Sequence, residues 1–380
     1  TFMREKLFFD LCRERGVPAP RANYATVKYN GEDWGFYTLI EQIDDQFLDW
    51  RIGDDSGNLF KAGSNFGGGD GEANLVYLGL DQSLYESSYE LKSNEETDDW
   101  YDLIDFIYFL NSSSDAEFES DLPSRLDLAP FLSSVAFNNL FSNLDTYTMS
   151  ARNYYLYHNM STDQWEWIKW DANETFGSYA FGVQTPMTSL PIDFYEGQRP
   201  LLERVFESDL FMSQYTSEIC LLLNTVFNPA YLNPVIDDYK ALIEEYVYAD
   251  NNKMFSNNDF ITNIESNLGA AGAGTIYGLK SFISQRFDYL SSAVDCSPFA
   301  SLDDYESEQI SVCPNPSADV IMLKGSIEYP MQYSLFGVDG KLIFDGVLND
   351  LNARIDISGL SSNIYYLRLG NKSIKFVKQN

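Results

Sequence analysis

The sequence predicts an α+β fold in two parts: a large mixed domain over residues 1–295 and a small all-β domain over residues 310–380. The chain has 380 residues, which exceeds the ~100–200 residues of a typical domain. Helical spacing of apolar residues dominates the first part, whereas the second shows only short strand patterns separated by Gly, Asn and Asp. Hydrophobic residues make up 44% of the chain, which is ample for a packed core.

The first predicted elements are a helix and a β-hairpin. Apolar side chains at helical spacing indicate a helix over residues 2–12, and a glycine four residues later ends it. Strand-like segments at residues 24–28 and 35–41 then flank Asn30-Gly31, a dipeptide typical of two-residue hairpin turns.

Helical patterns dominate the rest of the first part. Further helices are predicted over three segments and one long region: residues 44–52, 99–110, 128–140 and 201–294. Short strands interrupt them: residues 58–62, 154–157 and 165–170.

A polar, acidic linker at residues 296–309 separates the two parts. Seven short strand candidates follow it: residues 310–312, 320–324, 332–336, 341–346, 353–357, 365–369 and 373–377. Their spacing, with turn residues between them, is typical of a small β-sandwich.

The chain carries a large negative charge. With 25 Lys and Arg against 57 Asp and Glu, the formal net charge is −32. Such a balance excludes a nucleic-acid partner, because phosphate binding requires a basic surface. A solvated acidic surface is the simplest interpretation, and carboxylates that meet divalent cations outside the cell are the alternative. No run approaches the ~18 apolar residues of a transmembrane segment.

Histidine and cysteine usage limits the chemistry further. The single histidine, His158, excludes a multi-histidine zinc site, and no Gly-x-Ser-x-Gly elbow accompanies it. The four cysteines contain no Cys-x-x-Cys pair, which excludes a zinc ribbon. Cys296 and Cys313 flank the linker and are placed to close a loop. Cys12 and Cys220 lie in helical patterns that suit buried thiols.

Several short motifs follow one another in the last part of the chain. They are Pro314-Asn-Pro316, Leu335-Phe-Gly-Val-Asp339-Gly340-Lys341, Asp356-Ile-Ser-Gly-Leu360, Ile364-Tyr-Tyr-Leu-Arg368 and Lys375-Phe-Val-Lys378. In this order they resemble the type A sorting domain of the type IX secretion system of Gram-negative bacteria. Asn363 stands where that family usually has Gly, and Asn is the next best residue at a positive φ.

This resemblance implies export across the outer membrane, to the cell surface or the medium. The type IX machinery is then a partner, and the tail is usually removed after export. No catalysis is expected in this domain. The alternative is an ordinary β-sandwich module that binds a sugar or a protein.

A second set of motifs spans the first part of the chain. They are Met3-Arg-Glu-Lys-Leu, Arg15-Gly-Val-Pro-Ala-Pro20-Arg21, Gly35-Phe-Tyr-Thr-Leu-Ile-Glu41-Gln-Ile-Asp44, Asn58-Leu-Phe-Lys61, Tyr89-Glu-Leu-Lys92, Asn153-Tyr-Tyr-Leu-Tyr157 and Trp170-Asp171-Ala-Asn173-Glu-Thr-Phe176-Gly177. They resemble the CotH family, which is named after a spore-coat protein and is regarded as a family of atypical kinases.

The CotH resemblance implies an atypical protein-kinase-like fold and the cofactors ATP and Mg²⁺. The implied activity is phosphoryl transfer to a protein hydroxyl. The family's glycine-containing segment and a nucleotide-binding lysine lie upstream of the stretch that Met3 begins. Part of the N-terminal lobe is therefore expected to be missing from this chain.

Asp145 and Asn153 form the first candidate group. A kinase needs an Asp that orients the substrate hydroxyl and a downstream Asn that holds a metal. The two residues are eight positions apart, a longer separation than in ordinary protein kinases. The alternative is that both side chains cap turns.

Asp171 and Asn173 form the second candidate group. Asp171 follows an apolar strand and is placed to bind Mg²⁺ that bridges phosphates. Asn173 stands where the family usually shows a second Asp. It offers an oxygen without a charge, so we expect weaker metal binding.

Glu41, Lys61 and Lys92 are the candidate cofactor-binding residues. Glu41 ends an apolar strand and is placed to pair with a phosphate-binding lysine, and both lysines match family positions that can meet phosphates. The alternative for each is a solvated surface charge. The glycine-rich loop at residues 63–71 lacks Gly-Lys-Ser/Thr, so it is predicted to be a flexible surface loop and not a P-loop.

A rival function comes from another class of protein. The chain would be a non-catalytic cell-surface or adhesion protein that uses the same fold to bind glycans or a surface matrix component. Its support is the content of 26 Tyr and 27 Phe, the missing second Asp, and the shortage of ATP outside cells.

Overall fold

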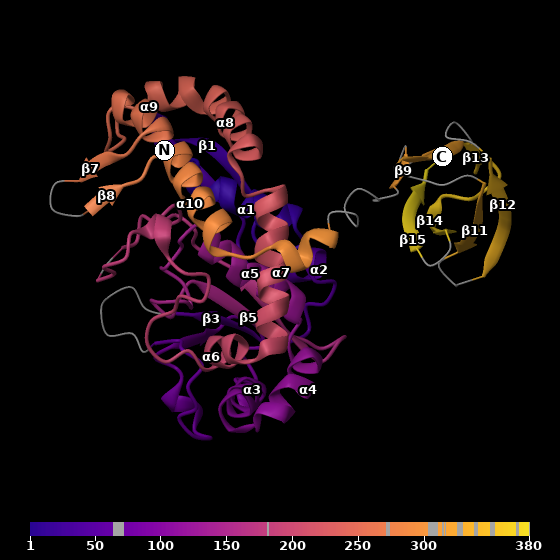
Figure 1. Cartoon of the computed structure of the whole chain (residues 1–380), viewed down its shortest axis with the longest axis horizontal. Coiled ribbons are helices and arrows are strands. Elements are labelled where there is room, and N and C mark those ends of the chain that lie inside the picture. Colours follow the sequence, from indigo (N-terminus) through magenta and orange to yellow (C-terminus); the bar gives the residue numbers. More distant parts are fainter. Residues whose placement is uncertain are drawn as a thin grey trace. The chain divides into compact units, whose positions relative to one another are not determined.

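The structure is a computed structural model in which the chain divides into two units, Thr1–Cys296 and Ser297–Asn380 (Figure 1). It describes residues 1–63, 72–180, 182–270, 274–302, 311–313, 315, 317–324, 330–337, 341–349, 354–369 and 372–379. Most of the glycine-rich loop, half of the linker and parts of the Pro314 and Asp339 motifs lie outside these residues.

A four-stranded antiparallel sheet lies at the centre of the N-terminal unit, in the order β4-β3-β5-β6. Its strands are β3 (Leu59–Ala62), β4 (Tyr89–Leu91), β5 (Tyr154–Asn159) and β6 (Gln164–Lys169). Lys61 pairs with Tyr155, and Tyr154 pairs with Lys169. The loop before β5 and the loop after β6 therefore meet at one end of the sheet.

Helices cover this sheet and extend the unit. They are α3 (Tyr101–Ser112), α4 (Asp115–Arg125), α5 (Leu128–Leu140), α6 (Pro200–Glu207), α7 (Asp209–Thr225), α8 (Pro229–Ala249), α9 (Asn257–Glu265) and α10 (Leu279–Ala293). Helix α5 packs against β6 through Phe131, whose ring meets that of Trp167 edge-on at 5.1 Å. The predicted helices are confirmed, and α4 is an additional helix that begins at a Ser114/Glu117 capping box. The short hairpin β7–β8 (Leu268–Ala270, Gly274–Ile276) lies in the region predicted to be mostly helical.

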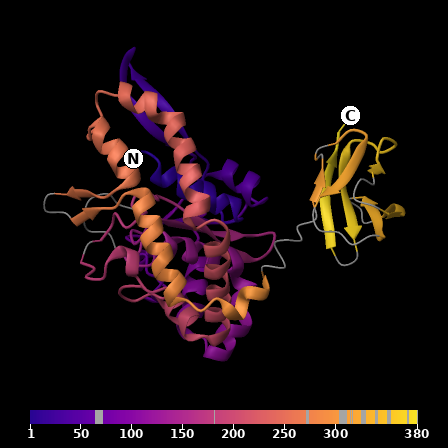
Figure 2. The same cartoon turned by 45° about the horizontal axis from the view of Figure 1, so that its top comes forward.

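The predicted N-terminal helix and hairpin are also confirmed. Helix α1 (Arg4–Glu14) is followed by β1 (Ala22–Tyr29), β2 (Glu32–Ile40) and helix α2 (Asp45–Arg51). Asn30 and Gly31 both have positive φ values, 52° and 87°, which is the geometry of the expected two-residue turn. Figures 1 and 2 show this indigo hairpin beside α8, where the ring of Phe36 stacks on that of Tyr246 at 5.8 Å.

Two fully buried arginines fasten the helices to the loops. Arg286 on α10 donates to the Leu190 carbonyl and to the carbonyl and side-chain oxygens of Asn139 on α5. Arg199 donates to the carbonyls of Tyr147 and Met149, in the loop before β5. A buried guanidinium has several donors to satisfy, so each arginine holds several backbone groups in place.

The C-terminal unit consists of two antiparallel sheets, in the orders β13-β10-β9 and β12-β11-β14-β15. Its strands are β9 (Ser311–Cys313), β10 (Val320–Lys324), β11 (Met331–Gly337), β12 (Leu342–Leu348), β13 (Arg354–Asp356), β14 (Asn363–Leu369) and β15 (Lys372–Lys378). Ile321, Leu335, Leu367 and Phe376 are buried between the sheets. All seven predicted strands are present.

The cysteine arrangement corrects the sequence-based expectation. Cys220 on α7 forms a disulfide with Cys296, so Cys220 is no free thiol and Cys296 is not available to Cys313. The two Cα atoms lie 5.6 Å apart although 76 positions separate them in the chain. Chain proximity favoured Cys313, but folding brings the end of the first unit next to α7. Cys12 is a buried free thiol, as predicted.

The helices among the described residues can be compared with the length and apolarity of a membrane span. No single helix has both the length and the apolarity to cross a membrane, and α7 and α8 meet these criteria only as a pair bent by 61°.

Breaking the Cys220–Cys296 disulfide should destabilise the N-terminal unit. Closure of a loop with a sequence separation of 76 is worth about 4 kcal/mol in the chain-entropy description. The Cys220→Ser/Cys296→Ser variant is therefore expected to melt roughly 5–10 °C below the wild type in calorimetry. Dithiothreitol should lower the melting temperature of the wild type alone. Equal melting temperatures for variant and oxidised wild type would contradict the assigned bond.

Candidate functional site

Left-handed backbone conformations gather at one end of the central sheet. Eleven described residues other than Gly have positive φ values, and five of them lie in the loop before β5 or directly after β6. They are Ser142, Ala151, Asn153, Asp171 and Phe176. Such conformations are unfavourable for most side chains and are retained where the surrounding structure requires them, often at functional sites.

Asp145 and Asn153 are joined by hydrogen bonds that close the loop before β5. The side-chain amide of Asn153 donates to the Asp145 carbonyl at 2.9 Å and to its carboxylate at 3.1 Å. Both side chains are partly buried. The eight-residue separation is thus compatible with direct contact, because the loop folds back on itself. The carboxylate of Asp145 is held by this contact.

Asp171 lies within electrostatic reach of Asp145. Burial raises the pKa of Asp171 above its usual value, and the negative charge of Asp145 raises it further. A hydrogen bond from the backbone N–H of Asn173 and the positive charge of Lys61 act in the opposite direction. The side chain of Asn173 is exposed. The structure therefore brings Asp145, Asp171 and Lys61 into one region.

Two carboxylates that sequence reasoning missed join this region. Glu5 on α1 accepts a hydrogen bond from the backbone N–H of Ala172 at 3.2 Å. Burial, and then the charge of Asp171, raise the pKa of Glu5 to about 7. Burial also raises the pKa of Glu174, and the charge of Asp145 adds to this effect. We refer to Glu5, Asp145, Asp171 and Glu174 as the acidic centre.

The acidic centre suits a hard cation in its chemistry. Carboxylate and amide oxygens are the ligands that Mg²⁺ prefers, and Asn153 and Asn173 add amide oxygens nearby. Within the described residues, no three His, Cys, Asp or Glu side chains already form a group that could hold a metal ion. The oxygen donors are of the kind that Mg²⁺ prefers, but the described carboxylates do not form a ready metal site, so water or phosphate oxygens would have to supply most of the coordination.

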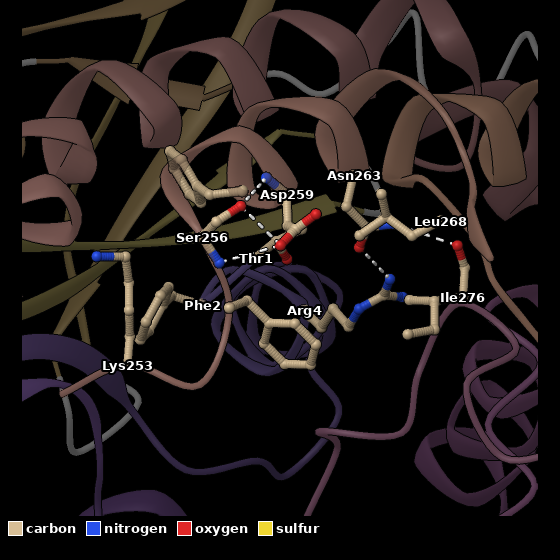
Figure 3. A pocket seen from close by; sticks show the side chains of 11 residues that line it. Thr1, Phe2, Arg4, Lys253, Ser256, Asp259, Asn263, Leu268 and Ile276 are labelled. Carbon is tan, nitrogen blue, oxygen red and sulfur yellow. Dashed lines mark hydrogen bonds between the residues drawn. The ribbon is translucent and has the colours of Figure 1, made fainter. Parts of the chain in front are cut away.

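Two basic residues flank the acidic centre. The ammonium of Lys61 lies 6.0 Å from the centre of the Trp170 ring. Arg4 donates to the carbonyls of Thr175 at 3.0 Å and Tyr277 at 2.6 Å, and to Asn263 Oδ1 at 3.0 Å. Figure 3 shows Arg4 and Asn263 on the wall of a neighbouring, mainly apolar pocket of about 130 Å³. These contacts of Arg4 tie the loop after Asp171 to α9 and to the segment before α10.

Lys169 fastens the strand that precedes Asp171. Its side chain is fully buried, and the amine donates to the Ser134 carbonyl at 3.0 Å and to Asn138 Oδ1. Burial lowers the pKa of Lys169 to about 7. The contacts anchor the end of β6 on α5. The sequence did not point to Lys169, because the apolar pattern of residues 165–170 does not show which face of the strand a helix covers.

Glu41 and Lys92 have other partners. Glu41 pairs with Arg21, whose Nε lies 2.8 Å from the carboxylate and whose guanidinium lies over the Trp50 ring at 4.6 Å. It was expected to pair with a lysine. Lys92 pairs with Glu90 at 3.0 Å. No interaction among the described residues joins Glu41 or Lys92 to the acidic centre.

His158 lies at the other end of β5 and bridges two carboxylates. Its Nδ1 is 3.1 Å from Asp102 on α3, and its Nε2 is 3.1 Å from Asp163 in the β5–β6 turn. The imidazole also stacks on Trp165 at 4.9 Å. Its contact with Asp102, more than any other interaction, raises its pKa, although burial opposes the shift. These contacts agree with a structural role for His158.

Comparison with known proteins gives two family matches. Residues 1–290 match the family described as CotH kinase protein, and residues 311–379 match the secretion system C-terminal sorting domain. The inner spore coat protein H of Bacillus subtilis (strain 168) is 29% identical over 254 residues, which cover 66% of this chain. The matched region also spans 66% of that relative's length.

The His158 bridge should make stability depend on pH. Only the imidazolium can donate to both carboxylates, so the folded pKa is expected to exceed the ordinary value of 6.5. The stabilisation is then complete below about pH 6.5 and is lost as the pH rises through the folded pKa. Because the chain has one histidine, a single C2–H resonance in proton NMR reports this pKa directly.

The control for this experiment is Asp102→Asn, which should move the midpoint back toward 6.5. In thermal melts from pH 5.5 to 8.5, the wild type should lose stability relative to His158→Gln as the pH rises. A wild-type midpoint at or below 6.5 would show that the two carboxylates do not stabilise the imidazolium.

Proposed function

The chain belongs to the CotH kinase protein family, and we propose that its N-terminal unit transfers a phosphoryl group from ATP to a protein hydroxyl with the help of Mg²⁺. The observation that carries this proposal is the convergence of Asp145, Asp171 and Lys61 at one end of the central sheet. Phosphoryl transfer needs little covalent help from a protein. It needs a positioned hydroxyl and cations beside the phosphate oxygens.

The sorting domain at residues 311–379 indicates secretion through the type IX system to the cell surface or the outside. The Cys220–Cys296 disulfide agrees with this location, since disulfides persist in oxidising compartments. The phosphoacceptor in our proposal is therefore a protein or a matrix component encountered during or after export.

We assign Asp145 the task of orienting the acceptor hydroxyl and accepting its proton. The hydrogen bonds from Asn153 support this assignment, because they hold the carboxylate in one orientation. The side-chain oxygen of Asn153 is not used by these bonds and remains available to a cation. A side chain fixed before the substrate arrives lowers the entropic cost of the reaction.

Asp171 is our principal metal ligand, with Asn153 and Asn173 as weaker partners. The raised pKa of Asp171 supports this role, because a carboxylate among other carboxylates gains most from a bound cation. Mg²⁺ held there would neutralise charge on the phosphate oxygens. Lys61 would contact the same phosphates. The proposal makes the N-terminal unit an atypical kinase-like fold, and it assigns no role to Glu41 and Lys92, which pair with Arg21 and Glu90.

One observation favours the rival, non-catalytic function. Large apolar side chains are exposed on the β1–β2 hairpin, with Tyr29 at 65%, Trp34 at 54% and Leu39 at 60% of their full exposure. Exposed aromatic residues are typical of surfaces that bind glycans or proteins. If this second candidate function holds, the family fold serves adhesion and the N-terminal unit does not bind Mg-ATP.

Substitutions at Asp171 and Asp145 should separate binding from chemistry. Asp171→Asn is expected to abolish Mg-ATP binding in isothermal titration calorimetry, because the cation loses its strongest charged ligand. Asp145→Asn should leave that affinity largely intact and reduce autophosphorylation by roughly 10²-fold or more. Asn173→Asp should tighten metal binding, since it adds a second carboxylate.

The matched control is Asp49→Asn, at an exposed position on α2 outside the acidic centre. It should change neither the affinity nor the rate. If the wild type binds no Mg-ATP and Asn173→Asp does not restore binding, the kinase proposal fails and the adhesion function takes its place.

A further inference from the structure

Arg152 is held in the loop before β5, between two residues with left-handed backbone. Ala151 and Asn153 have φ values of 53° and 61°. The N–H of Ala151 donates to the Thr146 carbonyl at 3.0 Å, and its carbonyl accepts from Ala73 at 3.0 Å. The side chain of Asn153 is bonded to Asp145. The backbone of Arg152 is thus fixed on both sides, next to the residue that positions Asp145.

The end of β3 packs directly on Arg152. A Cβ atom at Gly63 would lie 2.8 Å from the Cβ of Arg152, so the absence of a side chain at Gly63 allows this contact. Gly63 also has a φ of 79°, which favours glycine. Lys61 is two positions earlier on the same strand and pairs with Tyr155. Arg152 and Lys61 therefore lie at the same end of the sheet as the acidic centre.

The guanidinium of Arg152 is available to a ligand. Its side chain is exposed, and among the described residues it has no hydrogen bond or ion pair. Arg4, in contrast, is bonded to three protein groups. Burial raises the pKa of Tyr179, the charge of Asp145 raises it further and Arg152 opposes this, so Asp145 and Arg152 act on the same side chain.

We propose that Arg152 is a catalytic residue that contacts the transferred phosphoryl group through its guanidinium, opposite the hydroxyl oriented by Asp145. This inference rests on the proposed phosphoryl transfer. A planar guanidinium matches two phosphoryl oxygens, and it costs no desolvation of a protein partner here, because it has none among the described residues. An arginine in this role stabilises the charge that spreads over the phosphoryl oxygens in the transition state.

The reaction step that Arg152 assists is balanced. The acceptor oxygen forms a bond to the γ-phosphorus of ATP, and the bond from this phosphorus to the bridging oxygen breaks. The electron pair of the broken bond leaves with ADP. The hydroxyl proton passes to the carboxylate of Asp145. Arg152 neither gains nor loses a proton, so its effect is electrostatic.

Binding of a transition-state analogue tests the role of Arg152 without a turnover assay. Titration calorimetry of the full chain would compare the binding of Mg-ADP alone with that of Mg-ADP plus aluminium fluoride, which mimics the phosphoryl group in the transition state. The wild type should bind the fluoride complex more tightly, by about 10²-fold or more. Arg152→Ala should keep the Mg-ADP affinity within about twofold and lose most of the gain from aluminium fluoride.

Two further variants and one additive sharpen the test. In Arg152→Lys, aluminium fluoride should increase the affinity for Mg-ADP by an intermediate factor, because an ammonium keeps the charge but not the two-point contact. In Arg152→Ala, guanidine hydrochloride at millimolar concentration should restore part of the increase in affinity that aluminium fluoride produces. Arg354→Ala, at an exposed position on β13 in the C-terminal unit, is the matched control and should behave as the wild type. Autophosphorylation should fall by about 10³-fold in Arg152→Ala.

The outcomes distinguish this inference from the proposed function. A wild type that binds no Mg-ADP and shows no autophosphorylation would overturn both. An active wild type whose Arg152→Ala variant keeps the full gain from aluminium fluoride would overturn the role of Arg152 alone. An equal loss of affinity for Mg-ADP and for the fluoride complex would also overturn it, because Arg152 would then serve nucleotide binding and not the transition state.

Discussion

The hydrogen bonds from Asn153 to Asp145 determine the shape of the candidate site. They close the loop directly before β5 between two residues eight positions apart, so the strand and the carboxylate are placed by the same contact. Arg199 fastens the middle of this loop from the other side, through the carbonyls of Tyr147 and Met149. A loop held at both points tolerates unfavourable backbone at Ala151 and Asn153, since the bonded groups compensate for the strain.

Carboxylates and basic side chains gather around this loop, and their charges act on one another. Glu5, Asp171 and Glu174 all have raised pKa values, because each is partly removed from water beside other carboxylates. Repulsion between these carboxylates costs free energy, and a bound cation can offset it. Lys61 and Arg152 are two basic residues at this end of the sheet for which the described residues provide no hydrogen bond or ion pair, whereas Arg4 and Lys169 are bonded to carbonyl and amide oxygens. This combination of charges supports the proposed binding of a cation together with phosphate oxygens.

Two different kinds of anchoring hold the surrounding unit together. The buried basic side chains of Lys169 and Arg286 bind backbone carbonyls and amide oxygens of α5 and its neighbours instead of carboxylates. The Cys220–Cys296 disulfide joins α7 to the residue that ends the unit. Neither kind of contact reaches the acidic centre directly.

The sequence by itself determined the two-part α+β organisation, all seven C-terminal strands and the N-terminal hairpin, because periodicity and turn residues act over short distances. It also led to the prediction that Asp145, Asn153 and Asp171 are site residues, through short local motifs. Tertiary structure alone decided that Glu5 meets Asp171, that Glu41 pairs with Arg21 and that Cys220 bonds to Cys296. The register of the β1–β2 hairpin brings Glu41 to Arg21. The other two pairs are far apart in the chain, and only the packing of the helices against one another and against the central sheet brings them together.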